Sequence, residues 1–97
     1  MKVEIRFFAN LREIVGKKVE TVEFPEEEEI SVERVLQQLV NLYGEGFVDF
    51  VFNSETGEIE DYLTFMVNGK SIATLQGIKT KVKNDDVLAI LPPVGGG

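Results

Sequence analysis

Residues 31–44 read Ser-Val-Glu-Arg-Val-Leu-Gln-Gln-Leu-Val-Asn-Leu-Tyr-Gly, and this stretch decides the fold. Its apolar residues recur at the spacing of one helix face, and they are Val32, Val35, Leu36, Leu39 and Val40. Ser31 is a typical N-cap residue, and Glu33 suits the positive end of the helix dipole. Gly44 stands where a glycine commonly ends a helix. The sequence therefore predicts one main helix with one apolar face.

The segments on either side of this helix have strand patterns, because apolar and polar residues alternate or apolar runs end at turn residues. The predicted strands are residues 3–8, 17–24, 63–67, 71–73 and 87–91. Asn68-Gly69 predicts a hairpin turn, since both residues accept positive φ. We interpret residues 10–15 as a short connection, and residues 45–62 fit either a short helix or a strand.

Two strands, one helix and further strands indicate an α+β fold, and 97 residues suit a single domain. We expect a β-grasp (ubiquitin-like) arrangement with a mixed sheet of four to five strands and the main helix packed across it. Residues 3–8 and 87–91 are the most apolar strands, so we expect them to lie side by side at the centre of the sheet. If residues 3, 5 and 7 face the helix, Phe8 lies on the opposite face, and Leu91 does so by the same alternation.

The composition excludes several function classes. The net charge is −7, with 17 acidic and 10 basic residues, which disfavours nucleic acid and favours a basic protein partner. The chain has no Cys and no His, so thiol or histidine nucleophile chemistry and the usual metal sites are not expected. No apolar run approaches a membrane span, and the N-terminus does not resemble a signal peptide, so we expect a cytoplasmic protein without a membrane partner.

The last six residues, Pro92-Pro93-Val94-Gly95-Gly96-Gly97, carry the functional hypothesis. Pro-Pro keeps the preceding residue extended and projects the chain stiffly away from the fold. Three glycines without Cβ atoms then allow partner atoms to approach the backbone from all sides. We expect residues 92–97 to form a flexible tail, and the chemistry to lie on the α-carboxylate of Gly97.

Three segments resemble one family. Residues 7–16, Phe-Phe-Ala-Asn-Leu-Arg-Glu-Ile-Val-Gly, are similar to the FFAxxRExxG signature of the small subunit of molybdopterin synthase, the MoaD-like sulfur carriers. Val67-Asn68-Gly69 resembles the central hairpin of that family. Residues 85–97 resemble its DxDEVAxxPPVxGG ending, although Leu91 stands where an aromatic residue is usual.

The resemblance implies a sulfur carrier in molybdenum or tungsten cofactor synthesis that is non-catalytic alone and binds no cofactor. A ubiquitin-activating-type enzyme would use ATP to adenylate Gly97, with Gly96 as its essential neighbour, and a sulfur donor would give a thiocarboxylate. The large synthase subunit would then take the sulfur. The expected partner-binding residues are Phe8, Ile72, Leu91, Pro92, Pro93, Val94 and Gly95.

Two other functions remain open at this point. The same activation would allow Gly97 to be joined to a lysine of another protein, as in a ubiquitin-like modifier. Alternatively, the chain is a passive β-grasp binding module with no chemistry at its tail.

Overall fold

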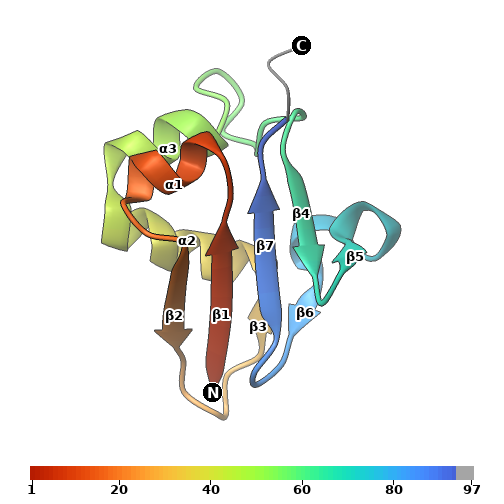
Figure 1. The fold of residues 1–97 in the computed structure, drawn as a ribbon. Coiled ribbons are helices and arrows are strands. Elements are labelled where there is room, and N and C mark those ends of the chain that lie inside the picture. The colour runs from red at the N-terminus through yellow and green to blue at the C-terminus, as the bar shows by residue number, and fades with distance from the viewer. Residues whose placement is uncertain (94–97) are drawn as a thin grey trace.

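The computed structural model describes residues 1–93 (Figure 1). Its strands are β1 (Lys2–Phe7), β2 (Val19–Glu23), β3 (Ile30–Ser31), β4 (Thr64–Val67), β5 (Lys70–Ser71), β6 (Lys81–Val82) and β7 (Val87–Leu91). Its helices are α1 (Asn10–Val15), α2 (Val32–Tyr43) and α3 (Glu45–Val51), with 3₁₀ turns η1 (Ile72–Thr74) and η2 (Gly77–Lys79). None of the described helices has the length and apolar run needed to cross a bilayer.

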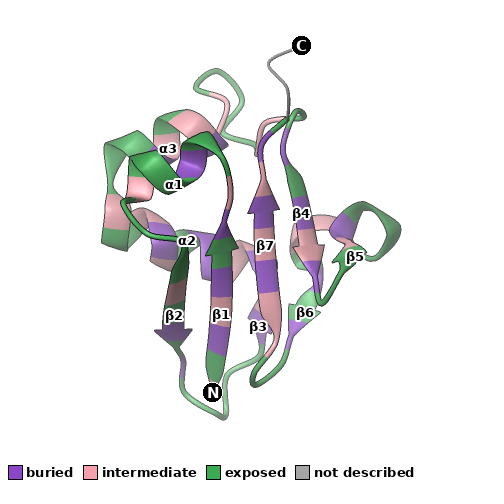
Figure 2. Ribbon diagram, in the orientation of Figure 1, coloured by how far each residue is buried: buried purple, intermediate pink, exposed green. Residues whose placement is uncertain are grey.

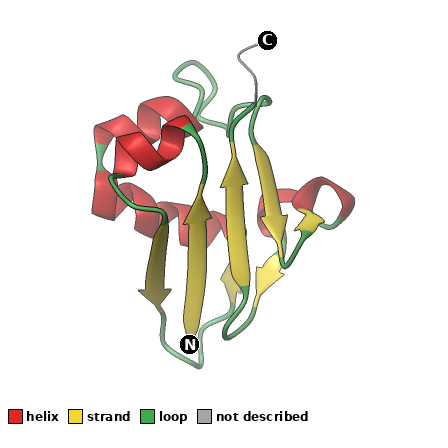
Figure 3. Ribbon diagram, viewed as in Figure 1, coloured by secondary structure: helices red, strands yellow, loops and turns green. Residues whose placement is uncertain are grey.

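Five strands form the main sheet, in the order β2-β1-β7-β4-β5, and β3 pairs with β6 apart from it. The first and last strands, β1 and β7, are parallel neighbours at the centre, and the other pairs are antiparallel. Helix α2 crosses one face of the sheet (Figures 1 and 3). This is the β-grasp fold, so the predicted fold class and the predicted central pairing are confirmed.

The core lies between α2 and the sheet, and Figure 2 shows the alternation of buried and less buried residues along β1 and β7. Val3, Ile5 and Phe7 of β1 are 0% exposed, as are Leu88 and Ile90 of β7. From α2 the core takes Val32, Val35, Leu36 and Leu39. The phase predicted for both central strands is therefore confirmed.

The predicted ends of α2 are also confirmed. The hydroxyl oxygen of Ser31 accepts a hydrogen bond from the backbone N–H of Arg34 at 3.3 Å. Gly44 ends the helix with φ 71°, and its N–H donates to the Val40 carbonyl. At the β4–β5 hairpin, Asn68 and Gly69 have φ of 50° and 83°, the two positive values that the sequence predicts.

One segment is more helical than the sequence predicts, and a second adopts one of the two structures that the sequence leaves open. The expected connection at residues 10–15 is helix α1, which buries Leu11 and ends at Gly16 with φ 78°. Of the two structures that residues 45–62 allow, the first part adopts the helix α3, because Phe47 and Val51 lie on one helical face and both enter the core.

A hydrogen bond between side chains ties α2 to the edge strand β2. The Tyr43 hydroxyl donates to the Glu20 carboxylate at 2.6 Å, and Lys17 also binds this carboxylate at 3.0 Å. The bond from Tyr43 is the largest cause that lowers the pKa of Glu20, while burial and the neighbouring carboxylate raise the pKa of Tyr43. The Tyr43 ring also makes an edge-on contact with Phe7, with ring centroids 5.7 Å apart.

We expect Tyr43→Phe to lower the free energy of unfolding at pH 7 by about 1 to 2 kcal/mol, the usual effect of losing a hydrogen bond to a charged group. Because the folded state lowers the pKa of Glu20, ionised Glu20 stabilises the fold above its ordinary pKa. That contribution is lost as the pH falls through the lowered pKa. The difference between wild type and variant should therefore shrink below about pH 4.

Urea unfolding at pH 7 and at acidic pH measures this difference. Tyr62→Phe is the matched control, because the Tyr62 hydroxyl donates to the Phe50 carbonyl at 2.8 Å on the exposed surface. A pH-independent effect of Tyr43→Phe would contradict the role given to the Glu20 carboxylate.

Candidate functional site

The end of β7 fixes the place where the C-terminal tail leaves the fold. Ile90 pairs with Phe7 on one side and with Phe65 on the other, and all three side chains are buried in the core. Leu91, the next residue, is half-buried, Pro92 is buried and Pro93 is exposed. The tail therefore starts one residue after a central core position, at the end of the sheet opposite the N-terminus (Figure 1).

A surface groove of about 410 Å³ lies at this point, and we call it the tail-root groove. Its lining comes from the β1–α1 connection, helix α1, the start of β4 and the end of β7 with the residues after it, and comprises Phe8, Ala9, Arg12, Thr64, Leu91, Pro92 and Pro93. The structure thus brings together four of the predicted site residues, namely Phe8, Leu91, Pro92 and Pro93. The other four on the tail, Val94, Gly95, Gly96 and Gly97, lie outside the described residues.

The position of Phe8 follows from the strand that precedes it. Phe7 points into the core, so Phe8 turns to the other side and remains half-buried. Ala9 then adopts φ 52° and ψ −132°, a backbone conformation that residues with a Cβ atom rarely adopt. Such a conformation costs on the order of 1–3 kcal/mol and is concentrated at functional sites. It sends the chain directly into α1 and leaves Phe8 at the rim of the groove.

Arg12 is a groove residue for which the sequence predicts no role. Its Nε atom donates to the Phe7 carbonyl at 2.9 Å, and its guanidinium lies 5.4 Å from the centre of the Phe8 ring. Both contacts are with the residues just before α1, so the first turns of this short helix hold Phe8 in place. The spacing of Phe8 and Arg12 in the sequence is the signal that could have suggested this contact.

The structure corrects the expectation that Ile72 belongs to the same surface. Ile72 is 5% exposed and is part of the hydrophobic core. Strand β5 ends at Ser71, whose hydroxyl accepts from the Ala73 N–H at 3.3 Å, and the 3₁₀ turn η1 begins at Ile72. Strand alternation therefore stops there, and the side chain points into the core.

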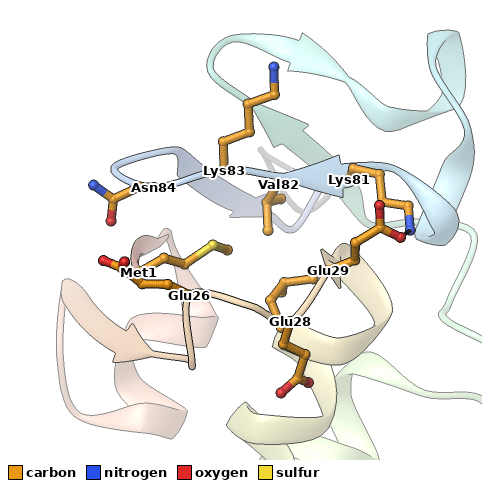
Figure 4. A pocket seen from close by; sticks show the side chains of 9 residues that line it. Met1, Glu26, Glu28, Glu29, Lys81, Val82, Lys83 and Asn84 are labelled. Carbon is orange, nitrogen blue, oxygen red and sulfur yellow. Dashed lines mark hydrogen bonds and ion pairs between the residues drawn. The ribbon is translucent and has the colours of Figure 1, made fainter.

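A second hollow, of about 630 Å³, lies near the N-terminus, away from the tail-root groove. Figure 4 shows that several charged residues line it, with Lys81 turned towards Glu29 of the acidic loop before β3 and the Lys83 side chain pointing away from that loop. The Lys81 ammonium pairs with Glu29 at 3.0 Å. Within residues 1–93 no group of acidic side chains is placed to hold a metal ion. Nothing in this hollow indicates chemistry, so the tail-root groove is the candidate site.

Comparison with known proteins identifies the family. The model of the ThiS family matches residues 5–97, which includes both the tail-root groove and the tail. The chain belongs to the ThiS family. Members of this family are ubiquitin-like small proteins, and the comparisons below include modifiers as well as a cofactor-synthesis subunit.

The chain is 32% identical to small archaeal modifier protein 3 of Haloferax volcanii, over the full length of both chains. The crystal structure of SAMP1 from the same organism superposes with a TM-score of 0.85 at 28% identity, again over the whole of each chain. A structure from Pyrococcus furiosus, named as subunit 1 of molybdopterin converting factor, superposes with a TM-score of 0.74 at 26% identity. The superposition covers 97% of this chain and 99% of the Pyrococcus furiosus chain.

We expect Ile72→Asp to unfold the chain and Phe8→Asp to leave it folded. Ile72→Asp places a charge in the core and should cost about 5 kcal/mol or more, enough to unfold a domain at the lower end of the ordinary range of stability. Phe8→Asp changes a half-buried side chain at the rim of the groove and should leave the chain folded. Thermal unfolding followed by circular dichroism measures both. A folded Ile72→Asp variant would contradict the correction made for this residue.

Proposed function

We propose that this chain is a carrier of an activated acyl group, formed on the α-carboxylate of Gly97 by an adenylating enzyme. The observation that carries this proposal is the tail-root groove. A half-buried aromatic residue and the half-buried end of a central strand flank the chain where it leaves the fold. A partner that grips this groove can hold the tail in a fixed orientation, because Leu91 follows a core residue directly.

The proposed activation step is a substitution at phosphorus. The Gly97 carboxylate attacks the α-phosphorus of ATP, a carboxylate oxygen–phosphorus bond forms, and pyrophosphate leaves. The product is an acyl adenylate, whose carbonyl carbon is open to nucleophiles because no side chain shields it. In this proposal ATP and the catalytic groups belong to the partner enzyme.

The acyl adenylate has two proposed reactions, which we call its outlets. The first outlet is sulfur transfer. Hydrosulfide from a sulfur donor attacks the acyl carbon, AMP leaves with the bonding electron pair, the S–H proton is lost, and Gly97 ends in a thiocarboxylate. On the large subunit of molybdopterin synthase this sulfur passes into the dithiolene that binds molybdenum or tungsten, and water restores the Gly97 carboxylate. The MoaD-like segments at residues 7–16 and 85–97 support this outlet, as does the likeness to the Pyrococcus furiosus protein.

The second outlet is conjugation to a protein. A lysine amine attacks the same acyl carbon, AMP leaves, and an isopeptide bond forms with loss of a proton from nitrogen. The identity over the full length with the Haloferax volcanii modifier protein favours this outlet. Both outlets need the same activated Gly97.

We expect deletion of Gly97, or addition of one residue after it, to abolish adenylation while leaving thermal stability nearly unchanged. The reacting carboxylate is moved or replaced, whereas the hydrophobic core formed within residues 1–93 consists of residues before Pro92. Pyrophosphate exchange with the adenylating enzyme and a melting curve measure the two properties. A passive binding module would keep its partner affinity after removal of Gly96 and Gly97.

The intact mass of the protein isolated from its native cell separates the two outlets. An unconjugated protein whose mass is raised because one sulfur replaces one oxygen indicates the sulfur carrier. Adducts of higher mass that contain the chain linked to lysine indicate the modifier.

We expect Phe8→Asp and Leu91→Asp to weaken binding to the adenylating enzyme by at least about tenfold, since each places a charge in the apolar centre of the contact. Glu23→Gln, a change on the exposed far strand β2, is the control and should bind normally. Isothermal titration on variants shown to be folded measures the affinity. Unchanged affinity for both groove variants would move the contact surface elsewhere.

A further inference from the structure

The three arginines of this chain differ in their partners. Arg6 binds the Glu4 carboxylate at 2.6 Å, and Arg34 binds the Glu28 carboxylate at 3.4 Å. Arg12 makes no ion pair with any residue that the structure describes, residues 1–93, although the chain has 17 acidic residues. The unpaired arginine is the one in the tail-root groove.

Arg34 also lies over an aromatic ring and, unlike Arg12, forms an ion pair among the described residues. Its guanidinium lies 5.1 Å from the centre of the Phe24 ring, much as that of Arg12 lies over Phe8. In both cases an aromatic ring supports the cation. A carboxylate completes the site at Arg34, whereas at Arg12 the Nε atom binds the Phe7 carbonyl instead.

Two contacts fix the Arg12 side chain and leave part of it free. The Phe7 carbonyl occupies Nε, and the Phe8 ring supports the guanidinium plane. The two terminal nitrogens have no hydrogen-bond partner within residues 1–93, and the residue is exposed. A planar pair of donors held in one orientation suits a carboxylate, which it binds through two parallel hydrogen bonds.

We propose that Arg12 binds a carboxylate side chain of the enzyme that activates Gly97 and thereby sets the orientation of the tail root. This inference rests on the function proposed above. With a net charge of −7, the chain attracts a basic partner surface but cannot fix its orientation by overall charge alone. Arg12, an arginine without an ion pair within residues 1–93, lines the groove together with Leu91 and Pro92 and marks a place where the partner can present an acid.

The experiment compares activation of wild type, Arg12→Gln, Arg12→Lys and Arg34→Gln by the adenylating enzyme. We expect Arg12→Gln to raise KM for this chain by about tenfold or more with little change in kcat, since binding rather than chemistry is affected. Arg12→Lys should regain only part of the loss, because an ammonium cannot form the paired hydrogen bonds. Arg34→Gln, with its own aromatic support, should match wild type.

Long-range electrostatic attraction alone predicts the opposite change in KM. Arg12→Gln makes the chain more negative, so steering towards a basic partner would improve and KM would fall. A lower or unchanged KM for a folded Arg12→Gln therefore overturns the inference while the proposed function stands. Failure of the enzyme to activate wild type overturns the proposed function and this inference with it.

A purely structural role of Arg12 is tested separately. Each exposed acid near the partner's active site is changed to its amide and combined with Arg12→Gln. The carboxylate that binds Arg12 should raise KM for wild type but have no further effect on Arg12→Gln. If the effect of every such acid on KM simply adds to that of Arg12→Gln, none of these acids binds Arg12. Arg12 then only supports Phe8, and the proposed contact is wrong. Should Arg12→Gln fail to fold, the same cycle is run with Arg12→Lys.

Discussion

The parallel pairing of β1 with β7 is the constraint on which the rest of this structure depends. It places the last strand between β1 and β4, where Leu88 and Ile90 are sealed in the core. Parallel neighbours need a crossover on one face of the sheet, and α2 lies on that face. The start of β7 is fixed as well, since the Asn68 side chain donates to Asp86 and accepts from the Val87 N–H, both at 2.9 Å. A strand fixed at both ends gives the tail a defined starting point.

The same alternation that builds the core also builds the proposed recognition surface. Phe7 and Phe8 are identical in chemistry and adjacent in sequence, yet one is 0% exposed and the other lies at the rim of the tail-root groove. Leu91 stands in the same relation to Ile90. In the proposed function, stability and partner recognition are therefore encoded by alternate residues along the two central strands. A shift of register by one residue would exchange the two sets and lose both.

Much of this fold could be predicted from local patterns. Helix α2 has caps and a complete apolar face, Asn68-Gly69 encodes its hairpin, and β1 and β7 alternate clearly. Helix α1 was missed because six residues with a single buried anchor, Leu11, leave no periodicity to detect. The start of residues 45–62 stayed ambiguous because its dense apolar residues fit a strand as well as a helix, and only packing of Phe47 and Val51 decides.

The candidate site was predictable where it follows strand phase and not where it depends on backbone geometry. Phe8 and Leu91 follow from alternation, whereas Ile72 was misplaced because a 3₁₀ turn replaces the strand at that residue. The positive φ of Ala9 could not be predicted from the sequence, because alanine ordinarily avoids positive φ. For Arg12, the spacing from Phe8 could have suggested the contact with the aromatic ring, whereas its hydrogen bond to the Phe7 backbone carbonyl has no signal in the sequence.

Chain length sets a further limit on how a partner can work. Gly97 is the fourth residue after Pro93, and four extended residues span at most about 14 Å. An enzyme that reacts with the Gly97 carboxylate must therefore place its reacting atoms within about that distance of Pro93, at the rim of the tail-root groove. Binding of the groove and chemistry on the tail cannot belong to distant parts of a partner. It follows that side chains fixed at this rim, Phe8 and Arg12 among them, lie close enough to the partner's active site to influence how the tail enters it.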